Sequence, residues 1–185
     1  MLLALQPNGL AEWLTDAAAF DTAGADALFA DFTSDPELDP LALVAALAVV
    51  TFRALLVTTL PARDGRPPSL ARTLTTLGRL SHGRLRILAD TVQVEELADL
   101  DLGLGVFRRI PGDPEAFEQV RAPDEVQRWV SAPLPDSRAE WWATLRGAAE
   151  RGCRGLLVPA DPRLLDLLRN PEDPGDRRDL QLATG

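Results

Sequence analysis

PLALVAALAVVTFRALLVTTLPARDGRPPSLARTLTTLGRLSHGRLRILAD, residues 40–90, reads as helix, strand, helix and strand with very short connections between them. An almost wholly apolar run follows Pro40, a residue that suits the first turn of a helix. Residues 54–59 form an apolar segment of strand length. Residues 69–80 then place their leucines on one helical stripe, and a glycine separates them from a second apolar segment at 85–89. This alternation predicts parallel βα units.

The same unit recurs twice elsewhere in the chain. Residues 11–31 and 139–161 each begin with Ala-Glu-Trp, continue through alanines to a glycine, and end in an apolar segment followed by aspartate. Such repetition is typical of βα units that close a barrel or wind an open sheet. Chance similarity between alanine-rich helices is the alternative explanation.

The sequence of residues 40–90 resembles that of one known family, the bacterial luciferase-like flavin-dependent oxidoreductases, which are TIM barrels. That family typically has a helix, Thr-x-Arg, a strand, and a helix that ends in Thr-Leu-x-x-Leu-Ser-x-Gly-Arg before its fourth strand. The residues that match this pattern are Thr51, Arg53, Thr76, Leu77, Leu80, Ser81, Gly83 and Arg84. Weaker support extends over residues 1–31 and 124–170.

The chain is short for such a barrel, which needs eight βα units and roughly 250 residues. It has 185 residues, and six or seven strands are expected, near 2–6, 27–31, 54–59, 85–89, 104–110, 127–131 and 155–159. The expected fold is therefore α/β, a shortened or incomplete TIM-barrel-like arrangement of mostly parallel strands with surrounding helices. Residues 91–112 are expected to replace the middle βα units with an acidic stretch and a hairpin. An open doubly wound sheet is the alternative.

One α/β luciferase-like domain is expected over residues 1–170, followed by a polar tail at 171–185. We find no targeting segment and no apolar run long enough to span a membrane, and therefore expect a cytoplasmic protein with no membrane partner. Because a barrel that lacks units would leave strand edges unpaired, a homodimer is expected to cover them.

Composition limits the possible chemistry. The net charge of −9 argues against a nucleic-acid partner, because no basic patch would neutralise phosphates. All 19 basic residues are arginine, which excludes a Schiff-base lysine and a P-loop lysine. Cys153 and His82 are the only residues of their types, so a disulfide within the chain and a cysteine-cluster metal site are excluded, and no metal is expected. His82 lies in a helix-to-strand turn, away from the face where barrels place their chemistry.

Functional side chains are expected at the carboxyl ends of the strands. Polar groups there suit a cofactor that brings its own reactivity, and the candidate cofactor-binding residues are Asn8, Thr58, Thr59, Asp90 and Ser131. The structural alternative is that each of them is a helix cap or a turn residue. No catalytic residue is assigned.

The family resemblance implies a flavoprotein oxidoreductase or monooxygenase that uses FMN or a deazaflavin on a small organic substrate. The alternative is a shortened relative that has lost catalysis and acts as a flavin-binding, structural or interaction protein. Asp161 favours caution, because Asp161-Pro162 reads as a helix N-cap and places a carboxylate where a cofactor phosphate would otherwise bind.

Overall fold

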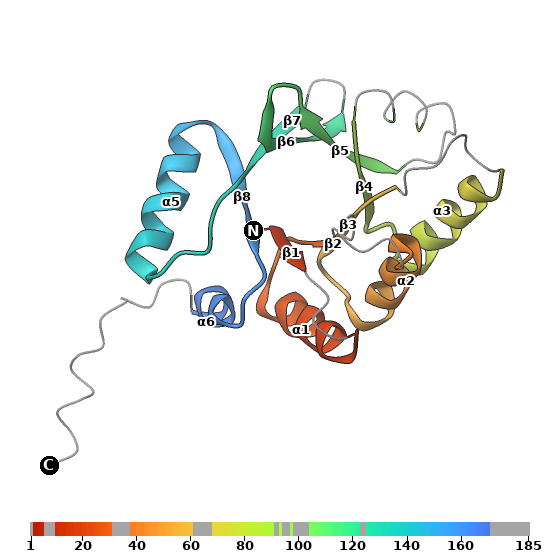
Figure 1. Ribbon diagram of the computed structural model, residues 1–185, viewed down its shortest axis with the longest axis horizontal. Helices are drawn as coiled ribbons and strands as arrows, with labels where there is room; N and C mark the ends of the chain where they lie inside the picture. The colour runs from red at the N-terminus through yellow and green to blue at the C-terminus, as the bar shows by residue number, and fades with distance from the viewer. Residues whose placement is uncertain are drawn as a thin grey trace, which may run out of the picture.

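The computed structural model describes residues 2–5, 10–30, 38–60, 68–90, 93, 97, 104–122 and 125–170. Strands and helices alternate over most of this part of the chain (Figure 1). The strands are β1 (Leu2–Leu5), β2 (Ala27–Ala30), β3 (Leu55–Thr59), β4 (Leu85–Ala89), β5 (Gly105–Ile110), β6 (Asp113–Ala122), β7 (Glu125–Ser131) and β8 (Cys153–Pro159). The helices are α1 (Leu10–Ala23), α2 (Pro40–Val50), α3 (Pro68–Leu80), α5 (Arg138–Glu150) and α6 (Arg163–Arg169).

The strands form one closed barrel in sequence order, β1 to β8. Strands β1 to β5 are parallel neighbours, β7 and β8 pair parallel, and β8 returns to β1 with Leu157 opposite Leu2. The two remaining pairs, β5 with β6 and β6 with β7, are antiparallel. The result is an α/β fold with a mostly parallel, curled sheet, which confirms the coarse part of the sequence prediction.

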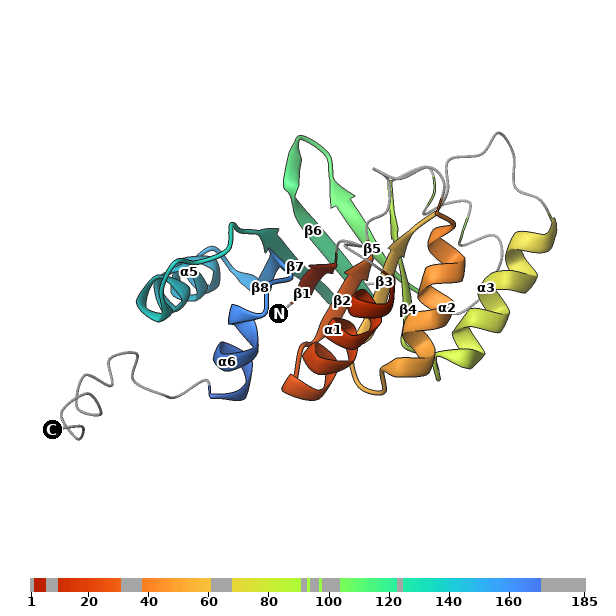
Figure 2. The ribbon, with the colours of Figure 1, turned by 60° about the horizontal axis from the view of Figure 1, so that its bottom comes forward.

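Two apolar cores follow from the alternation of side chains along each strand. Outward-facing residues such as Leu28, Leu56 and Ile87 pack with buried helix residues, including Trp13 of α1 and Leu47 of α2. The inward-facing residues form a second cluster that fills the barrel, made of Ala27, Phe29, Val57, Leu88, Phe107, Phe117 and Trp129. Helices α1, α2 and α3 cover the outside of β1 to β4 (Figure 2).

Local sequence explains where several helices begin. Asp39 caps α2, because its Oδ1 accepts hydrogen bonds from the backbone N–H groups of Leu41 at 2.8 Å and Ala42 at 3.2 Å. Ser137 caps α5 in the same way, with its Oγ accepting from the backbone of Glu140 at 3.2 Å. None of the described helices is both long and apolar enough to cross a bilayer.

The region that the sequence described least well is 104–131. The expected hairpin exists, but it consists of β5 and β6, with the turn at Pro111-Gly112 and a left-handed Gly112 at φ +82°. Strand β6 was not predicted, because charged residues interrupt its apolar ones; Ala116, Phe117 and Gln119 are buried. Residues 91, 92, 94–96 and 98–103, which carry the acidic stretch, lie outside the described residues, as do 171–185.

The closure of the barrel corrects two expectations. The open doubly wound alternative is wrong, because β1 pairs with β8. The expected unpaired edges are also wrong among the described strands, since the meander of β5, β6 and β7 spans the interval between β4 and β8. Unpaired strand edges therefore no longer support a homodimer, which stays a prediction.

Candidate functional site

The carboxyl ends of the parallel strands meet at one end of the barrel, here called the mouth, which lies at the top in Figure 2. A small apolar hollow with a cavity volume of about 10 Å³ lies inside the barrel. Its lining consists of Phe29, Val57, Leu88, Phe107, Phe117 and Leu157. Phe29, Leu88 and Leu157 each stand within two residues of the carboxyl end of their strand, so the hollow lies toward the mouth.

Large side chains fill the barrel around this hollow. The Trp129 ring lies directly over Gly155, where an added Cβ would stand 2.6 Å from Cζ3 of the indole. Arg86 covers Gly105 in the same manner, with its Cδ 2.5 Å from the position of such a Cβ. The two glycines therefore provide the space for two large interior side chains, and a ligand would rest on a packed floor rather than enter a channel.

The indole nitrogen of Trp129 is a buried donor that has no hydrogen-bond partner among the described residues. Trp129 belongs to the same cluster as the lining of the hollow, and its ring centroid is 6.3 Å from that of Phe107. A buried N–H without an acceptor is rare in proteins and carries a desolvation penalty. The barrel interior thus holds an unused polar donor beside an otherwise apolar lining.

Arg109 contacts this lining through the ring of Phe117. It is the Cα partner of Phe117 across the β5–β6 hairpin, and its guanidinium carbon lies 5.6 Å from the centroid of the Phe117 ring. Arg108 and Arg128 on the same hairpins pair with Glu118 and Asp113, whereas exposed Arg109 has no carboxylate partner among the described residues. Among the described residues, the mouth therefore combines an apolar lining with an arginine that has no carboxylate partner and is stacked on an aromatic ring.

The predicted cofactor-binding residues that the structure describes do not all lie on the same face of the sheet. Thr59 is half-buried on the inward face of β3, opposite Leu88, and Ser131 is half-buried at the end of β7, opposite Leu157. Both residues are thus strand neighbours of lining residues, but neither belongs to the lining itself. Thr58 is fully buried on the outward face, in register with Ala30 and Ile87, and its Oγ1 contacts the carbonyl of Thr59 at 3.3 Å. Asn8 lies outside the described residues.

Asp90 follows β4 and is exposed, but it is engaged in a local turn. Its Oδ1 accepts a hydrogen bond from the backbone N–H of Gln93 at 2.8 Å. Its own backbone N–H donates to Oε1 of Gln93 at 3.2 Å. The turn alternative that the sequence left open describes what this carboxylate does in the structure.

Asp161, also at the mouth, has the capping role that its sequence suggests. Its Oδ1 accepts from the backbone N–H of Arg163 at 2.9 Å and pairs with the guanidinium of the same residue at 3.0 Å. The hydrogen bonds from Arg163 lower the pKa of Asp161 below its ordinary value. The carboxylate of Asp161 is thus already paired with Arg163, and it occupies the start of α6 where an anion would otherwise bind.

The residues that carry the family resemblance gather at the opposite end of the barrel. Arg84 is buried and donates to the carbonyls of Ala48, Thr51, Ala54 and Ser81 and to Oγ1 of Thr51. Ser81 Oγ accepts from the backbone of Leu85 at 3.2 Å. These matched residues hold two helix-to-strand connections together, so the resemblance describes structural parts of the chain and does not reach the mouth.

Asp21 of α1 completes this polar cluster. Its carboxylate accepts hydrogen bonds from the backbone N–H groups of Phe52, Arg53 and Ala54 at 2.8, 3.0 and 2.6 Å. Burial raises the pKa of Asp21, but these hydrogen bonds and the charge of Arg84 outweigh burial and hold it below its ordinary value. Burial lowers the pKa of Arg84, and Asp21 opposes that shift.

The sequence analysis missed Arg109 and Phe117. The alternation along the strand places Gly105, Phe107 and Arg109 on one face, but the sequence carries no signal for the register that sets Arg109 opposite Phe117. Within the described residues, no three His, Cys, Asp or Glu side chains are grouped as metal ligands would be.

No family model and no curated protein matches the sequence. Among solved structures, the chain is similar to 3-dehydroquinate dehydratase from Geobacillus kaustophilus HTA426 at 15% identity and a TM-score of 0.37, over 92% of this chain and 67% of that one. It is also similar to a designed cube-shaped, highly porous protein cage at 18% identity and a TM-score of 0.40, over 86% of this chain and 62% of that one. Both scores are too low to support an argument about fold or function.

Proposed function

We propose that the mouth binds a flat, mostly apolar anion, and that the ligand is FMN or a deazaflavin in a flavin-dependent oxidoreductase that acts on a small organic substrate. The observation that carries this proposal is Arg109, which is stacked on Phe117 beside a hollow lined only by apolar side chains. In the same proposal the fold is a shortened TIM barrel, in which β5 to β7 replace βα units.

The chemistry of these residues fits the parts of the cofactor. Phe107, Phe117 and their apolar neighbours offer a surface for a ring system, since aromatic side chains stack favourably on flat rings. Arg109 offers a charge-assisted donor to a phosphate. Thr59 and Ser131 add hydroxyl groups at the rim. A bound flavin would supply the redox chemistry, and the residues of the chain would hold it and exclude water from one face.

A second candidate function is a binding or structural protein without catalysis. Two observations favour it. The six lining residues include no acid, base or nucleophile. Ligand sites usually enclose about 300 Å³ or more, whereas the cavity volume of this hollow is about 10 Å³.

Reconstitution separates these candidates. The purified full chain is titrated with FMN and with a deazaflavin at micromolar concentrations, and binding is followed by flavin absorbance and fluorescence. The flavin proposal expects saturable binding, and absence of binding by both cofactors would overturn it. Bound flavin that a nicotinamide donor reduces supports the oxidoreductase. Bound flavin that a nicotinamide donor does not reduce favours the binding protein.

A further inference from the structure

The end of the barrel opposite the mouth carries exposed apolar side chains. Val49 is 62% exposed, Phe52 is 75% exposed and Leu80 is 42% exposed. They stand at the carboxyl-terminal ends of α2 and α3 or directly after them, and these two helices are neighbours. Among the described residues only Val126, on β7, is another exposed large hydrophobic side chain.

Phe52 belongs to a connection that is firmly held. The backbone N–H groups of Phe52, Arg53 and Ala54 all bond to the buried carboxylate of Asp21. Arg84 bonds the carbonyl of Thr51 at 2.8 Å and that of Ser81 at 2.9 Å, so one guanidinium ties the residue before Phe52 to the residue before His82. A side chain that is exposed on an ordered backbone loses little backbone entropy when it binds a partner.

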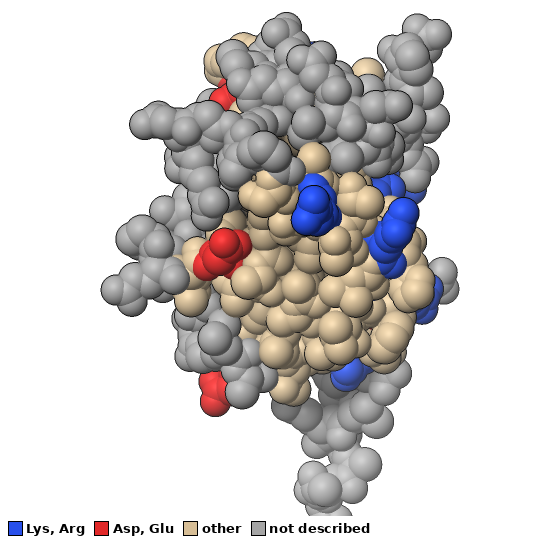
Figure 3. Space-filling model, turned by 90° about the vertical axis from the view of Figure 1, so that its right-hand side faces the viewer, with Lys and Arg blue, Asp and Glu red and all other residues tan. Residues whose placement is uncertain are grey.

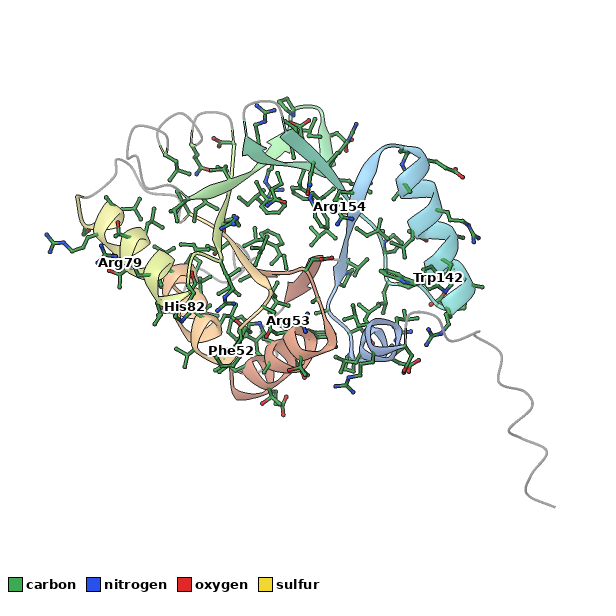
Figure 4. All side chains as sticks on the ribbon, turned by 180° about the vertical axis from the view of Figure 1, so that it is seen from behind. Phe52, Arg53, Arg79, His82, Trp142 and Arg154 are labelled. Carbon is green, nitrogen blue, oxygen red and sulfur yellow. The ribbon has the colours of Figure 1, made fainter. Side chains whose placement is uncertain are left out.

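Two arginines and a histidine surround this position. Arg53, Arg79 and His82 are exposed, and Figure 4 shows them with Phe52 along one side of this end of the barrel. His82 has a left-handed backbone at φ +53°, and its N–H bonds the carbonyl of Arg79 at 3.0 Å, which fixes the turn. In Figure 3, arginine side chains lie along the right-hand edge, the side that Figure 4 views from the front, and a broad uncharged area adjoins them.

Few acidic groups oppose these cations. On the connections and helix ends that form this surface, Asp21 is buried and engaged by the three N–H groups, and Asp26 is the exposed carboxylate. The whole chain has a net charge of −9. A local excess of arginine on an acidic protein is a feature of surfaces that recognise carboxylates.

We propose that Val49, Phe52 and Leu80, together with Arg53, Arg79 and His82, form a docking surface for an acidic polypeptide segment that carries an apolar side chain. The apolar residues contact that side chain, and Arg53 and Arg79 pair with the flanking carboxylates. Phe52 is the anchor, because exposed aromatic side chains with arginine neighbours contribute most of the binding energy of many interfaces.

Two other occupants fit the surface less well. A second copy that bound through the same face about a twofold axis would bring the same arginines together. The net negative charge of the chain would repel nucleic acid, and the apolar residues of the surface make no favourable contact with phosphates. The surface lies at the other end of the barrel from the mouth, so this proposal does not depend on flavin binding.

The test uses the full chain and a fluorescent synthetic peptide of glutamates around a central pair of leucines. Binding is measured by fluorescence anisotropy. The variant is Phe52→Ala, and Val126→Ala is the matched control, because it truncates an exposed apolar residue elsewhere. Circular dichroism checks that both variants are folded.

The proposal expects saturable binding of the acidic peptide, a loss of about tenfold or more in F52A, and unchanged binding in V126A. It also expects weaker binding in Arg53→Glu, and no binding of a peptide with lysines in place of the glutamates. Equal binding by F52A and the parent chain would overturn the proposal, as would equal binding of the lysine peptide. Full competition by single-stranded DNA would overturn it too, because the surface would then be a general polyanion site.

Discussion

Arg84 donates a hydrogen bond from Nη1 to Oγ1 of Thr51 at 3.0 Å, and the two residues are 33 positions apart in the chain. Arg84 belongs to the connection before β4, and Thr51 ends α2. The same guanidinium also bonds four backbone carbonyls. One buried side chain thereby joins two successive βα units at the end of the barrel opposite the mouth.

We expect Arg84→Met to lower the free energy of unfolding by about 3 kcal/mol or more, since several buried carbonyls would lose their donors. Urea denaturation measures the loss. Arg79→Met, the same substitution at an exposed position on α3, is the control and should change stability by less than about 0.5 kcal/mol. Similar stabilities for the two variants would show that the Arg84 cluster does not hold the connections together.

Asp21 should give the protein an acid-sensitive stability. Its folded pKa lies below the ordinary value of 3.8, so its contribution is fully present above that value and is lost as pH falls through the lower, folded pKa. Asp21→Asn should therefore lower stability at neutral pH and flatten the decline below pH 3.8. Urea midpoints across an acid pH series measure this. Asp16→Asn, an exposed carboxylate on the same helix, should leave the profile of the parent chain unchanged.

Gly155→Ala should disturb the barrel interior. The new Cβ would meet the Trp129 ring at 2.6 Å, and the ring is packed within the inner cluster. Overpacking of this kind costs about 1–3 kcal/mol. Thermal unfolding measures the loss, and near-ultraviolet circular dichroism reports the displaced indole.

Gly147→Ala is the matched control for that experiment. Gly147 lies within α5, and the nearest atom to its new Cβ is Nη1 of Arg151 at 3.8 Å. Alanine should stabilise the helix by about 0.5–1 kcal/mol. If G155A were as stable as G147A, the position of Trp129 over Gly155 would be contradicted.

The parts of the fold that were predictable are those with unambiguous apolar patterns. The predicted bounds are nearly correct for the strands at 55–59 and 85–89 and for the helix at 68–80. The reason is that an apolar run such as LLVTT fits only a strand, and a leucine stripe fits only a helix. Strand β6 was missed because Glu115 and Glu118 interrupt its apolar residues, so no regular apolar alternation is visible in the sequence. Closure of the barrel could not be predicted, because it depends on a pairing between Leu2 and Leu157, at opposite ends of the chain.

The candidate site was predictable only in its location. Polar residues after strands pointed to the mouth, and Thr59 and Ser131 stay predictions, in register with the lining residues Leu88 and Leu157. Thr58 is one position away from Thr59, yet the pleat turns it toward the helices. Arg109 could not be chosen over Arg108 from sequence, because the register with Phe117 and Glu118 decides which arginine is paired and which is free to bind an anion.

The most direct test of the proposed site compares FMN with riboflavin, which lacks the phosphate, on the parent chain and on Arg109→Gln. Quenching of flavin and tryptophan fluorescence measures both affinities, and Arg79→Gln serves as the control. If Arg109 holds the phosphate, the parent chain and R79Q should bind FMN about tenfold or more tightly than riboflavin, and R109Q should bind both equally. Equal affinities of the parent chain for the two flavins, or an FMN preference that survives in R109Q, would contradict the site.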